Sequence, residues 1–330
     1  MSKIVCFGEA LIDLLAQGPT LPGAPRAFLQ YAGGAPANVA VAAARLGADT
    51  HFAGMLGEDM FGDFLLDSLT AMGVATDCIV RTGETKTALA FVALDADGER
   101  SFSFYRPPAA DLLFRAEHFG PGCFDGVGVF HVCSNSLTDD AVAEATLHGM
   151  ARAREAGAVV SLDLNLRPAL WPRGVDPLPR LWRALEQADL VKVSREELEY
   201  LVRPAGDEAA VLSRLFAAQA RCVVVTDGAA PMRWFTRESD GQVTGFRVDA
   251  LDTTAAGDAF VGGLLVRLRE RGGAGHGFAG FCRDRAAIED AIRFGAAVGA
   301  LAVTRKGAFA AMPDRDQVQR LLQEQSLHAP

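Results

Sequence analysis

Short apolar runs alternate with helical patterns along most of this 330-residue chain. Runs that stay apolar at consecutive positions are typical of strands buried on both faces of a parallel sheet. Their alternation with helices indicates βαβ units, and therefore an α/β fold in which helices cover a mostly parallel sheet. The predicted strands span 3–8, 50–56, 126–132, 158–165, 189–194 and 221–228, and the clearest predicted helices, each ending on a glycine, span 36–47, 60–73 and 138–157.

Two regions break this alternation. Residues 87–106 form two alternating runs joined by Asp-Ala-Asp-Gly, which is typical of a β-hairpin. Residues 11–32 contain a second strand-like pair, interrupted by GPTLPGAP. These strands are partly polar, so we expect a small separate sheet, with a pair of surface hairpins as the alternative. The expected limits are 1–12, 33–86 and 108–330 for the main domain, and 13–32 and 87–107 for the small sheet.

Charge and cysteine usage narrow the partners and the location. The net charge of −9 and the pI near 5.2 argue against nucleic acid or an anionic membrane as the main partner. No apolar stretch is long enough to span a membrane, and the opening MSKIVCFGEA does not fit a signal peptide. The six cysteines show neither CxxC nor zinc-like spacing, so we expect free thiols in a reducing compartment. The expected location is therefore cytoplasmic.

Several common cofactor signatures are absent or misplaced. No lysine follows a glycine, so the chain has no P-loop, and HExxH is missing as well. A formal GxGxxG match at Gly275, Gly277 and Gly280 follows a predicted helix instead of a strand. The segment CFGEALIDL, at the first strand, lacks the glycine fingerprint that a dinucleotide-dependent oxidoreductase requires. The sequence therefore argues against both of these nucleotide-binding classes.

The segment LDTTAAGDAFVGGLL (251–265) places Asp258 at the start of an apolar helix. One explanation is compensation of the helix dipole, worth about 0.3–1 kcal/mol. Asp258 completes no capping box, because position 255 is alanine instead of serine or threonine. The small residues Ala255, Ala256 and Gly257 leave the first backbone N–H groups open to an anion. This pattern favours phosphoryl transfer, in which the N–H groups hold the phosphoryl group and Asp258 takes a proton from the acceptor hydroxyl.

Two further segments carry hydrogen-bonding residues at element ends. In GGAPANVAVAAARLG (33–47), Asn38 lies about one turn inside a helix and could hold ligand hydroxyls; a tight turn into a packed helix is the alternative. In SLDLNLRPALWP (161–172), Asp163, Asn165 and Arg167 follow a predicted strand. Ligands bind beyond the carboxyl ends of strands in open parallel sheets. We therefore expect a site at this edge, with Asp13, just past the first strand, beside it.

These motifs together resemble the ribokinase-like (PfkB) carbohydrate kinases, and among them the fructokinases. DTTAAGDAF is similar to the family's C-terminal signature, DTxGAGD, and GGAPANVAVAAARLG followed by GMLGEDMFG is similar to its N-terminal signature. The segments RTGETKTALAFVALDADGERSFSFYRPPAADLLF and DLNLRPALWP are particularly like fructokinases. The resemblance runs from VCFGEALIDLL to TRKGAFAAMP, which is nearly the whole chain.

The resemblance implies a three-layer α/β/α fold, with the small sheet closing as a lid over a sugar and often helping to form a homodimer. It implies ATP and Mg²⁺ as cofactors, with K⁺ in many members. Asp258 would be the catalytic base, and Ala255, Ala256 and Gly257 would form the anion hole. The implied sugar-binding residues are Asp13, Gly33, Gly34, Asn38, Arg106, Asn165, Arg167 and Asp258.

The nucleotide and metal residues follow from the same resemblance. The implied ATP-binding residues are Lys192, Ser194, Thr226, Gly228, Gly257 and Gly307. Glu197 would organise water bound to Mg²⁺, and Asp252 and Thr254 would belong to a loop that binds a monovalent cation.

Three departures from the family pattern bear on the substrates. Ala255 replaces the first glycine of GAGD, so we expect a helix-compatible φ there. Ser194 replaces a frequent asparagine, as in fructokinases, and Ala296 replaces a frequent asparagine near the adenine.

The expected reaction is ATP-dependent phosphorylation of the primary hydroxyl of a ketohexose, D-fructose giving fructose 6-phosphate. A 2-keto-3-deoxygluconate kinase is the first alternative, because sugar-acid kinases share AAGD and Arg106 or Arg167 could bind a carboxylate. A non-catalytic sugar-binding relative is the more remote alternative, and the presence of Asp258 argues against it.

Overall fold

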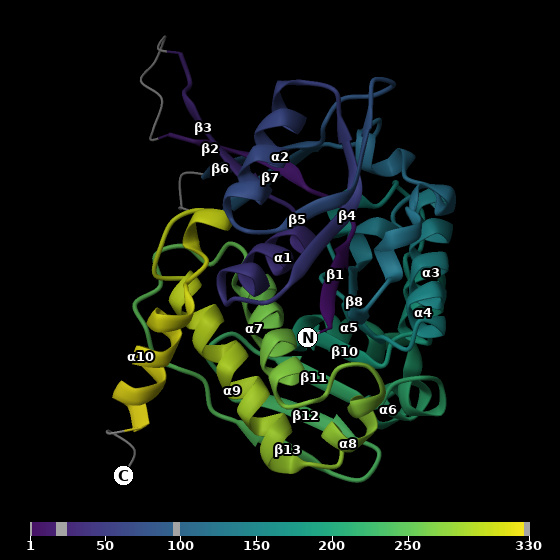
Figure 1. Cartoon of the computed structure of the whole chain (residues 1–330), viewed down its shortest axis with the longest axis vertical. Helices are drawn as coiled ribbons and strands as arrows, with labels where there is room; N and C mark the ends of the chain where they lie inside the picture. Colours follow the sequence, from purple (N-terminus) through teal and green to yellow (C-terminus); the bar gives the residue numbers. More distant parts are fainter. Residues whose placement is uncertain (1, 18–24, 95–99, 327–330) are drawn as a thin grey trace.

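A large twisted sheet forms the middle layer of the computed structural model, which describes residues 2–17, 25–94 and 100–326 (Figure 1). In spatial order its strands are β13 (Asp240–Val243), β12 (Met232–Thr236), β11 (Cys222–Thr226), β10 (Leu190–Ser194), β9 (Val159–Asp163), β8 (Val127–Cys133), β1 (Lys3–Phe7), β4 (Thr50–Gly57) and β5 (Ala75–Thr82). Neighbours from β11 to β5 pair in parallel, while β12 and β13 add an antiparallel edge.

All six strands predicted from apolar runs are confirmed, and they are neighbours in the sheet. The strands without such a run, β5, β12 and β13, lie at or next to its two edges. Strands at or next to an edge are less fully buried, as the alternating burial of β12 illustrates, and they therefore do not carry the continuous apolar runs of central strands.

The helices form the two outer layers. They are α1 (Ala35–Arg45), α2 (Met60–Ala71), α3 (Asp140–Glu155), α4 (Leu178–Leu185), α5 (Arg195–Ala205), α6 (Glu208–Ala217), α7 (Ala256–Glu270), α8 (Phe278–Phe281), α9 (Arg285–Ala302) and α10 (Arg315–Ser326). Short 3-10 helices include η1 (Ala110–Leu113), η2 (Ala116–His118), η3 (Pro121–Phe124), η4 (Ser134–Leu137), η5 (Pro168–Leu170), η6 (Gly275–Gly277) and η7 (Phe309–Ala311).

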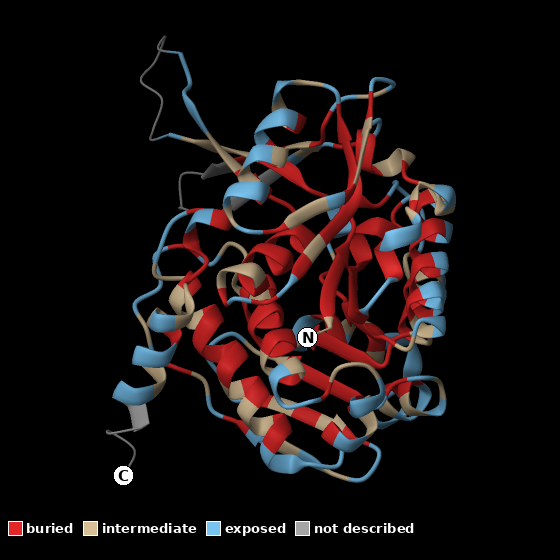
Figure 2. Cartoon of the chain, in the orientation of Figure 1, coloured by how far each residue is buried: buried red, intermediate tan, exposed pale blue. Residues whose placement is uncertain are grey.

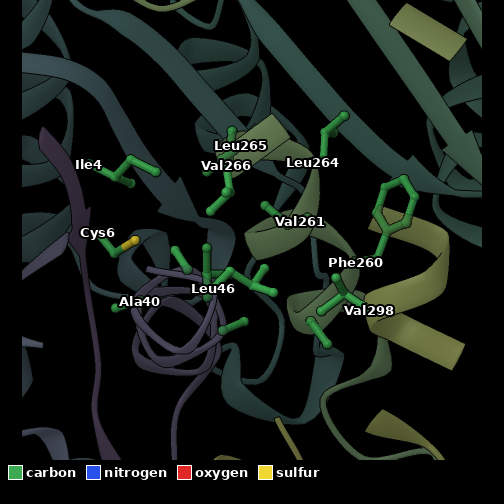
Figure 3. Close-up of a cluster of buried hydrophobic side chains, with 14 of the residues drawn as sticks. Ile4, Cys6, Ala40, Leu46, Phe260, Val261, Leu264, Leu265, Val266 and Val298 are labelled. Carbon is green, nitrogen blue, oxygen red and sulfur yellow. The ribbon is translucent and has the colours of Figure 1, made fainter. Parts of the chain in front are cut away.

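Alternate residues of β1 divide the core between the two sides of the sheet. Ile4 and Cys6 pack with α1, α7 and α9, as the close-up shows (Figure 3). Val5 and Phe7 belong to the cluster that α3, α4, α5 and α6 cover. Burial is concentrated on the strands and the inner faces of the helices (Figure 2). The three-layer α/β/α prediction is therefore confirmed.

The four partly polar strands form a sheet of their own, in the order β3 (Phe28–Gly33), β2 (Leu11–Ala16), β6 (Leu89–Leu94) and β7 (Arg100–Tyr105). Both predicted strand pairs are antiparallel, and β2 joins them by pairing in parallel with β6. The expectation of one small sheet is therefore confirmed, and the alternative of two separate surface hairpins is wrong. The Asp-Ala-Asp-Gly turn and most of GPTLPGAP lie outside the described residues.

One expectation about the cysteines is wrong. Cys78 on β5 and Cys123 in η3 are paired as a disulfide, with their Cα atoms 5.9 Å apart. The spacing of 45 residues hides this pair, because only the fold brings β5 and η3 together. Cys6, Cys133, Cys222 and Cys282 are free and buried, as expected. Within the described residues, no helix has both the length and the apolar character needed to cross a membrane.

Candidate active site

The N-termini of α1 and α7 meet at the carboxyl edge of the large sheet. Asn38, in the first turn of α1, donates from Nδ2 to Oδ2 of Asp258 in α7 at 2.7 Å. Asn165, just beyond β9, donates from Nδ2 to the other carboxylate oxygen at 3.4 Å. The Oδ1 atom of Asn38 is buried without a hydrogen-bond partner in the described part of the chain. The structure thus brings together three of the sequence-predicted site residues.

The Asp258 carboxylate is buried at the start of α7. Burial raises its pKa to about 7, and the negative charge of Asp163 adds to the rise. The hydrogen bond from Asn38 and the charges of Arg167 and Lys192 oppose it. The Asp258 carboxylate therefore gains and loses its proton near neutral pH. A pKa in this range suits a general base.

The expectation of a helix-compatible φ at Ala255 is wrong. Ala255 is the N-cap of α7 and adopts the left-handed conformation, with φ 58° and ψ 13°. A left-handed residue with a Cβ costs roughly 1–2 kcal/mol, which explains why glycine suits this position. The amide of Ala256 donates to the carbonyl of Thr253 at 3.3 Å, and helix geometry points the next amides out of the helix start.

A buried lysine lies beside this helix start. The Lys192 ammonium would be 3.2 Å from a Cβ built on Gly257, so it stands next to the backbone of the first turn. It pairs with Asp163, 3.0 Å from Oδ1 and 3.1 Å from Oδ2. Neighbouring strands β9 and β10 hold the two residues opposite one another. This pair keeps a positive charge at the point where α7 can receive an anion.

Ser194 and Glu197 form a capping box at the start of α5. The Ser194 hydroxyl accepts from the amide of Glu197, and Glu197 Oε2 accepts from the amide of Ser194 at 2.7 Å. The other oxygen, Oε1, accepts from the amide of Leu166 at 2.8 Å. Glu197 therefore fastens the loop of Asn165 and Arg167 to α5. Thr226 lies opposite Ser194 on the next strand.

Asp13, on β2 of the small sheet, faces the same site. Its carboxylate lies against Gly33, where any side chain would collide with it. Burial raises the pKa of Asp13 to about 7, and the charges of Asp258 and Asp252 raise it further. Asp13 therefore lies within electrostatic reach of Asp258 and Asp252, although it comes from a distant part of the chain.

Asp252 organises the loop before α7. Its Oδ1 accepts from the amide of Thr254 at 2.8 Å, and its Oδ2 accepts from the amide of Gly307 at 3.1 Å. Gly307 has φ +92° and lies so close to the Tyr31 ring of β3 that an added Cβ would be 2.9 Å from it. The expected cation loop and the expected ATP residue Gly307 are thus in direct contact.

The remaining predicted residues lie less centrally. Arg106 is only 2% exposed, and its guanidinium is paired with Asp111 at 2.7 Å. Arg167 is exposed, although its charge reaches Asp258. Gly228 is an exposed turn residue with φ +53° just beyond β11.

Some buried polar residues near the site have little or no sequence signal. Asn135 and Thr138 stand outside every recognised motif, and Asp111 lies in the fructokinase-like segment 81–114 without any local pattern that singles it out. Glu9 carries a weak signal, because it is an acid directly after the apolar run of β1. Asp163 is visible as a polar strand end, but its partnership with Lys192 depends on strand order.

Comparison with known proteins shows the family of this chain. Residues 1–315 match the model of the pfkB family carbohydrate kinases. Fructokinase-1 of Zea mays is 40% identical over 323 residues, which cover 97% of this chain and 98% of the relative. Xylella fastidiosa fructokinase with bound ATP is 58% identical, with a TM-score of 0.94 over 98% of this chain and 99% of that chain.

A second solved structure carries sugar and product. This fructokinase double mutant from Vibrio cholerae O395, bound to fructose, ADP and potassium ion, is 36% identical, with a TM-score of 0.85 over 98% of both chains. Family model, relatives and structures all span nearly the whole chain. The chain belongs to the pfkB family of carbohydrate kinases.

Proposed function

We propose that this carbohydrate kinase transfers the γ-phosphoryl group of ATP to the primary hydroxyl of D-fructose, giving fructose 6-phosphate. The observation that carries the proposal is the buried Asp258 carboxylate, held by Asn38 at the open start of α7. Fructokinases that bind ATP, or fructose and ADP, share the fold over nearly the whole chain, which supports fructose as the acceptor.

The first step would be activation of the acceptor. Asp258, with a pKa near 7, accepts the proton of the primary hydroxyl as that oxygen bonds to the γ-phosphorus, while the bond from the γ-phosphorus to the β–γ bridging oxygen breaks and ADP leaves. The outward amides that follow Ala256, beginning with that of Gly257, receive the negative charge that spreads over the phosphoryl oxygens. Lys192, held by Asp163 beside Gly257, neutralises part of this charge. The site therefore combines a proton acceptor for the sugar hydroxyl with a positively charged position that receives the phosphoryl group.

The sugar would be oriented by groups around Asp258. Asp13 and the free Oδ1 of Asn38 would accept hydrogen bonds from sugar hydroxyls, beside the Gly33–Gly34 backbone. Asn165 and Arg167 would contribute donors from the loop beyond β9. Arg106 would act from beneath the site, since its guanidinium is engaged by Asp111.

ATP would lie along the ends of β10 and β11, with contacts from Lys192, Ser194, Thr226, Gly228, Gly257 and Gly307. Mg²⁺ supplies charge neutralisation on the phosphates when it is bound. Both Glu197 oxygens accept a backbone N–H and keep further lone pairs, so this carboxylate fits metal-bound water better than direct ligation. Asp252 and the Thr254 loop offer the hard oxygen donors that suit K⁺.

A coupled assay of ADP formation across sugars tests the substrate. We expect turnover with fructose and much weaker turnover with ribose, adenosine and fructose 6-phosphate. The sugar acid 2-keto-3-deoxygluconate is the decisive comparison, because AAGD and the exposed Arg167 fit a carboxylate. Turnover of the sugar acid alone would overturn the fructose assignment.

Activity should depend on pH through Asp258. Burial raises its pKa to about 7, and only the deprotonated form accepts a proton. The kcat/KM for sugar should therefore fall below pH about 7, approaching tenfold per pH unit, and should level off above it. Asp13 has a similar pKa and steepens the acid side.

The measurement is kcat/KM from about pH 5 to 9 in the wild type and in Asp13→Asn, which removes one of the two titrations. A profile that stays flat between pH 6 and 7 in both proteins would contradict Asp258 as the base.

The small sheet supports a homodimer. Phe28, Leu29 and Tyr105 are 36%, 41% and 64% exposed, and the Phe91 ring joins Phe28 and Tyr105 at 5.3 Å and 5.1 Å. A second copy could cover these rings. Light scattering should give twice the mass of one chain, and a monomer would refute the idea.

We also propose a cytoplasmic location, where ATP is supplied; recovery outside the cytoplasmic fraction would refute it.

A further inference from the structure

A buried polar cluster lies under the junction between the small sheet and the large domain. It consists of Glu9, Arg106, Asp111, Asn135 and Thr138, and each of them is at most 6% exposed. These residues come from the end of β1, the end of β7, η1 and the η4 turn. The function proposed above gives a role to Arg106 and names Asp111 as its partner, but it assigns none to Glu9, Asn135 or Thr138.

Glu9 fastens the start of α1. Its Oε1 accepts from the amide of Ala35 at 3.1 Å and from Nδ2 of Asn135 at 2.9 Å. Ala35 is the first residue of α1 and directly follows the Gly33–Gly34 pair. The Gly34 backbone also packs against the backbone of Glu9 and Ala10, with no room for a Cβ. Glu9 therefore sets where α1 begins, and Asn38 lies one turn further on.

Arg106 fastens the end of the small sheet. It directly follows β7, donates from Nε to Asp111 Oδ2 at 2.8 Å, and donates from Nη1 to the Thr138 hydroxyl at 3.1 Å. Thr138 in turn donates to the carbonyl of Asn135 at 3.0 Å, which leads back to Glu9. A chain of hydrogen bonds thus connects the small sheet to the glycine pair.

The charges reinforce this connection. Two buried acids face one buried base, and a buried charge is costly unless it is paired and hydrogen-bonded. Burial raises the pKa of Glu9, and the charge of Arg106 is the strongest influence that opposes the rise. Arg106 is therefore attracted to Glu9 as well as to Asp111, and displacement of one disturbs the others.

We propose that Glu9 is a positioning residue for the sugar: it holds the Gly33–Gly34 pair and the start of α1 in register with Arg106 at the base of the small sheet. The inference rests on the proposed function, because the proposed function places the sugar between the start of α1 and the small sheet. Asp13 and Asn38, the groups proposed to bind the sugar, lie on either side of the glycine pair. Glu9 itself does not touch the reacting atoms in this proposal.

Two variants of Glu9 separate its two connections. Glu9→Gln keeps an oxygen acceptor for Ala35 and Asn135 but removes the charge that attracts Arg106. Glu9→Asp keeps the charge but withdraws the carboxylate from Ala35. Each should raise the KM for fructose about ten- to a hundredfold, while the KM for ATP changes less than about twofold. The exposed Glu117→Gln is the matched control and should leave both constants unchanged.

The split between the two substrates is the critical readout, because a merely structural role would affect fructose and ATP alike. Hydrogen exchange of the 33–42 segment should also accelerate in Glu9→Asp. If a Glu9 variant does not fold, Thr138→Val, which is similar in shape, should give the same split at about threefold or more. An unchanged fructose KM in folded variants, or an equal rise in both KM values, would overturn the proposal.

The wild-type enzyme is assayed first. Absence of fructose turnover there would refute the proposed function and not this inference. The sugar that the wild type does phosphorylate would then replace fructose in the comparison of variants.

Discussion

Replacement of Asp258 by asparagine should lower kcat by about 10²- to 10⁴-fold, the usual contribution of a general base. Asparagine has almost the same shape and keeps one oxygen that can accept the hydrogen bond from Asn38. It cannot accept the proton of the sugar hydroxyl. The dissociation constant for the sugar, measured by calorimetry, should therefore stay within a few-fold of the wild-type value while turnover is lost.

The exposed Asp67→Asn, in α2, is the matched control and should keep full activity. Near-normal kcat in Asp258→Asn would refute the proposed mechanism. Loss of sugar binding together with turnover would mean that Asp258 acts mainly by holding the substrate.

Lys192→Met should damage stability and catalysis together. The side chains of Lys192 and Asp163 are 9% and 1% exposed, so removal of the ammonium leaves a buried carboxylate without its partner. Breaking a buried pair in this way costs about 3–5 kcal/mol. The kcat/KM for ATP should also fall by about 10²- to 10³-fold, as when one preorganised stabiliser of transition-state charge is removed.

The double variant Lys192→Met/Asp163→Leu separates the two effects. Replacing both partners with apolar residues of similar volume should restore most of the free energy of unfolding, because no buried charge is then unpaired. Activity should stay low, since the cation beside Gly257 is still missing. Chemical denaturation and the coupled assay measure the two effects. Recovery of activity in the double variant would contradict the proposed role of Lys192.

The parallel sheet could be predicted from the chain because β1, β4, β8, β9, β10 and β11 are continuous apolar runs. The small sheet could be predicted because its strands are partly polar and carry turn residues. Strands β5, β12 and β13 could not, since strands at or next to a sheet edge are less fully buried and lack a continuous apolar run.

Some features of the site could likewise be predicted from the sequence, and others could not. Asp258, Asn38 and Asn165 could be selected from sequence, because an amide or carboxylate at the end of an apolar element needs partners. The left-handed Ala255 could not, since alanine ordinarily signals helix and the tertiary fold overrides that preference here. The disulfide pair of Cys78 and Cys123 is likewise invisible until β5 and η3 are adjacent.

The sequence by itself determined the layer architecture, the small sheet and the identity of the residues at the carboxyl edge, because local patterns of apolarity and turn chemistry encode them. Only the tertiary structure decided which of these residues touch. Asn38 and Asp258 are separated by 220 positions, and Glu9 and Asn135 by 126, yet each pair is hydrogen-bonded. Burial decided the proton affinity of Asp258, because a carboxylate gains its raised pKa from the packed surroundings and not from its neighbours in the chain.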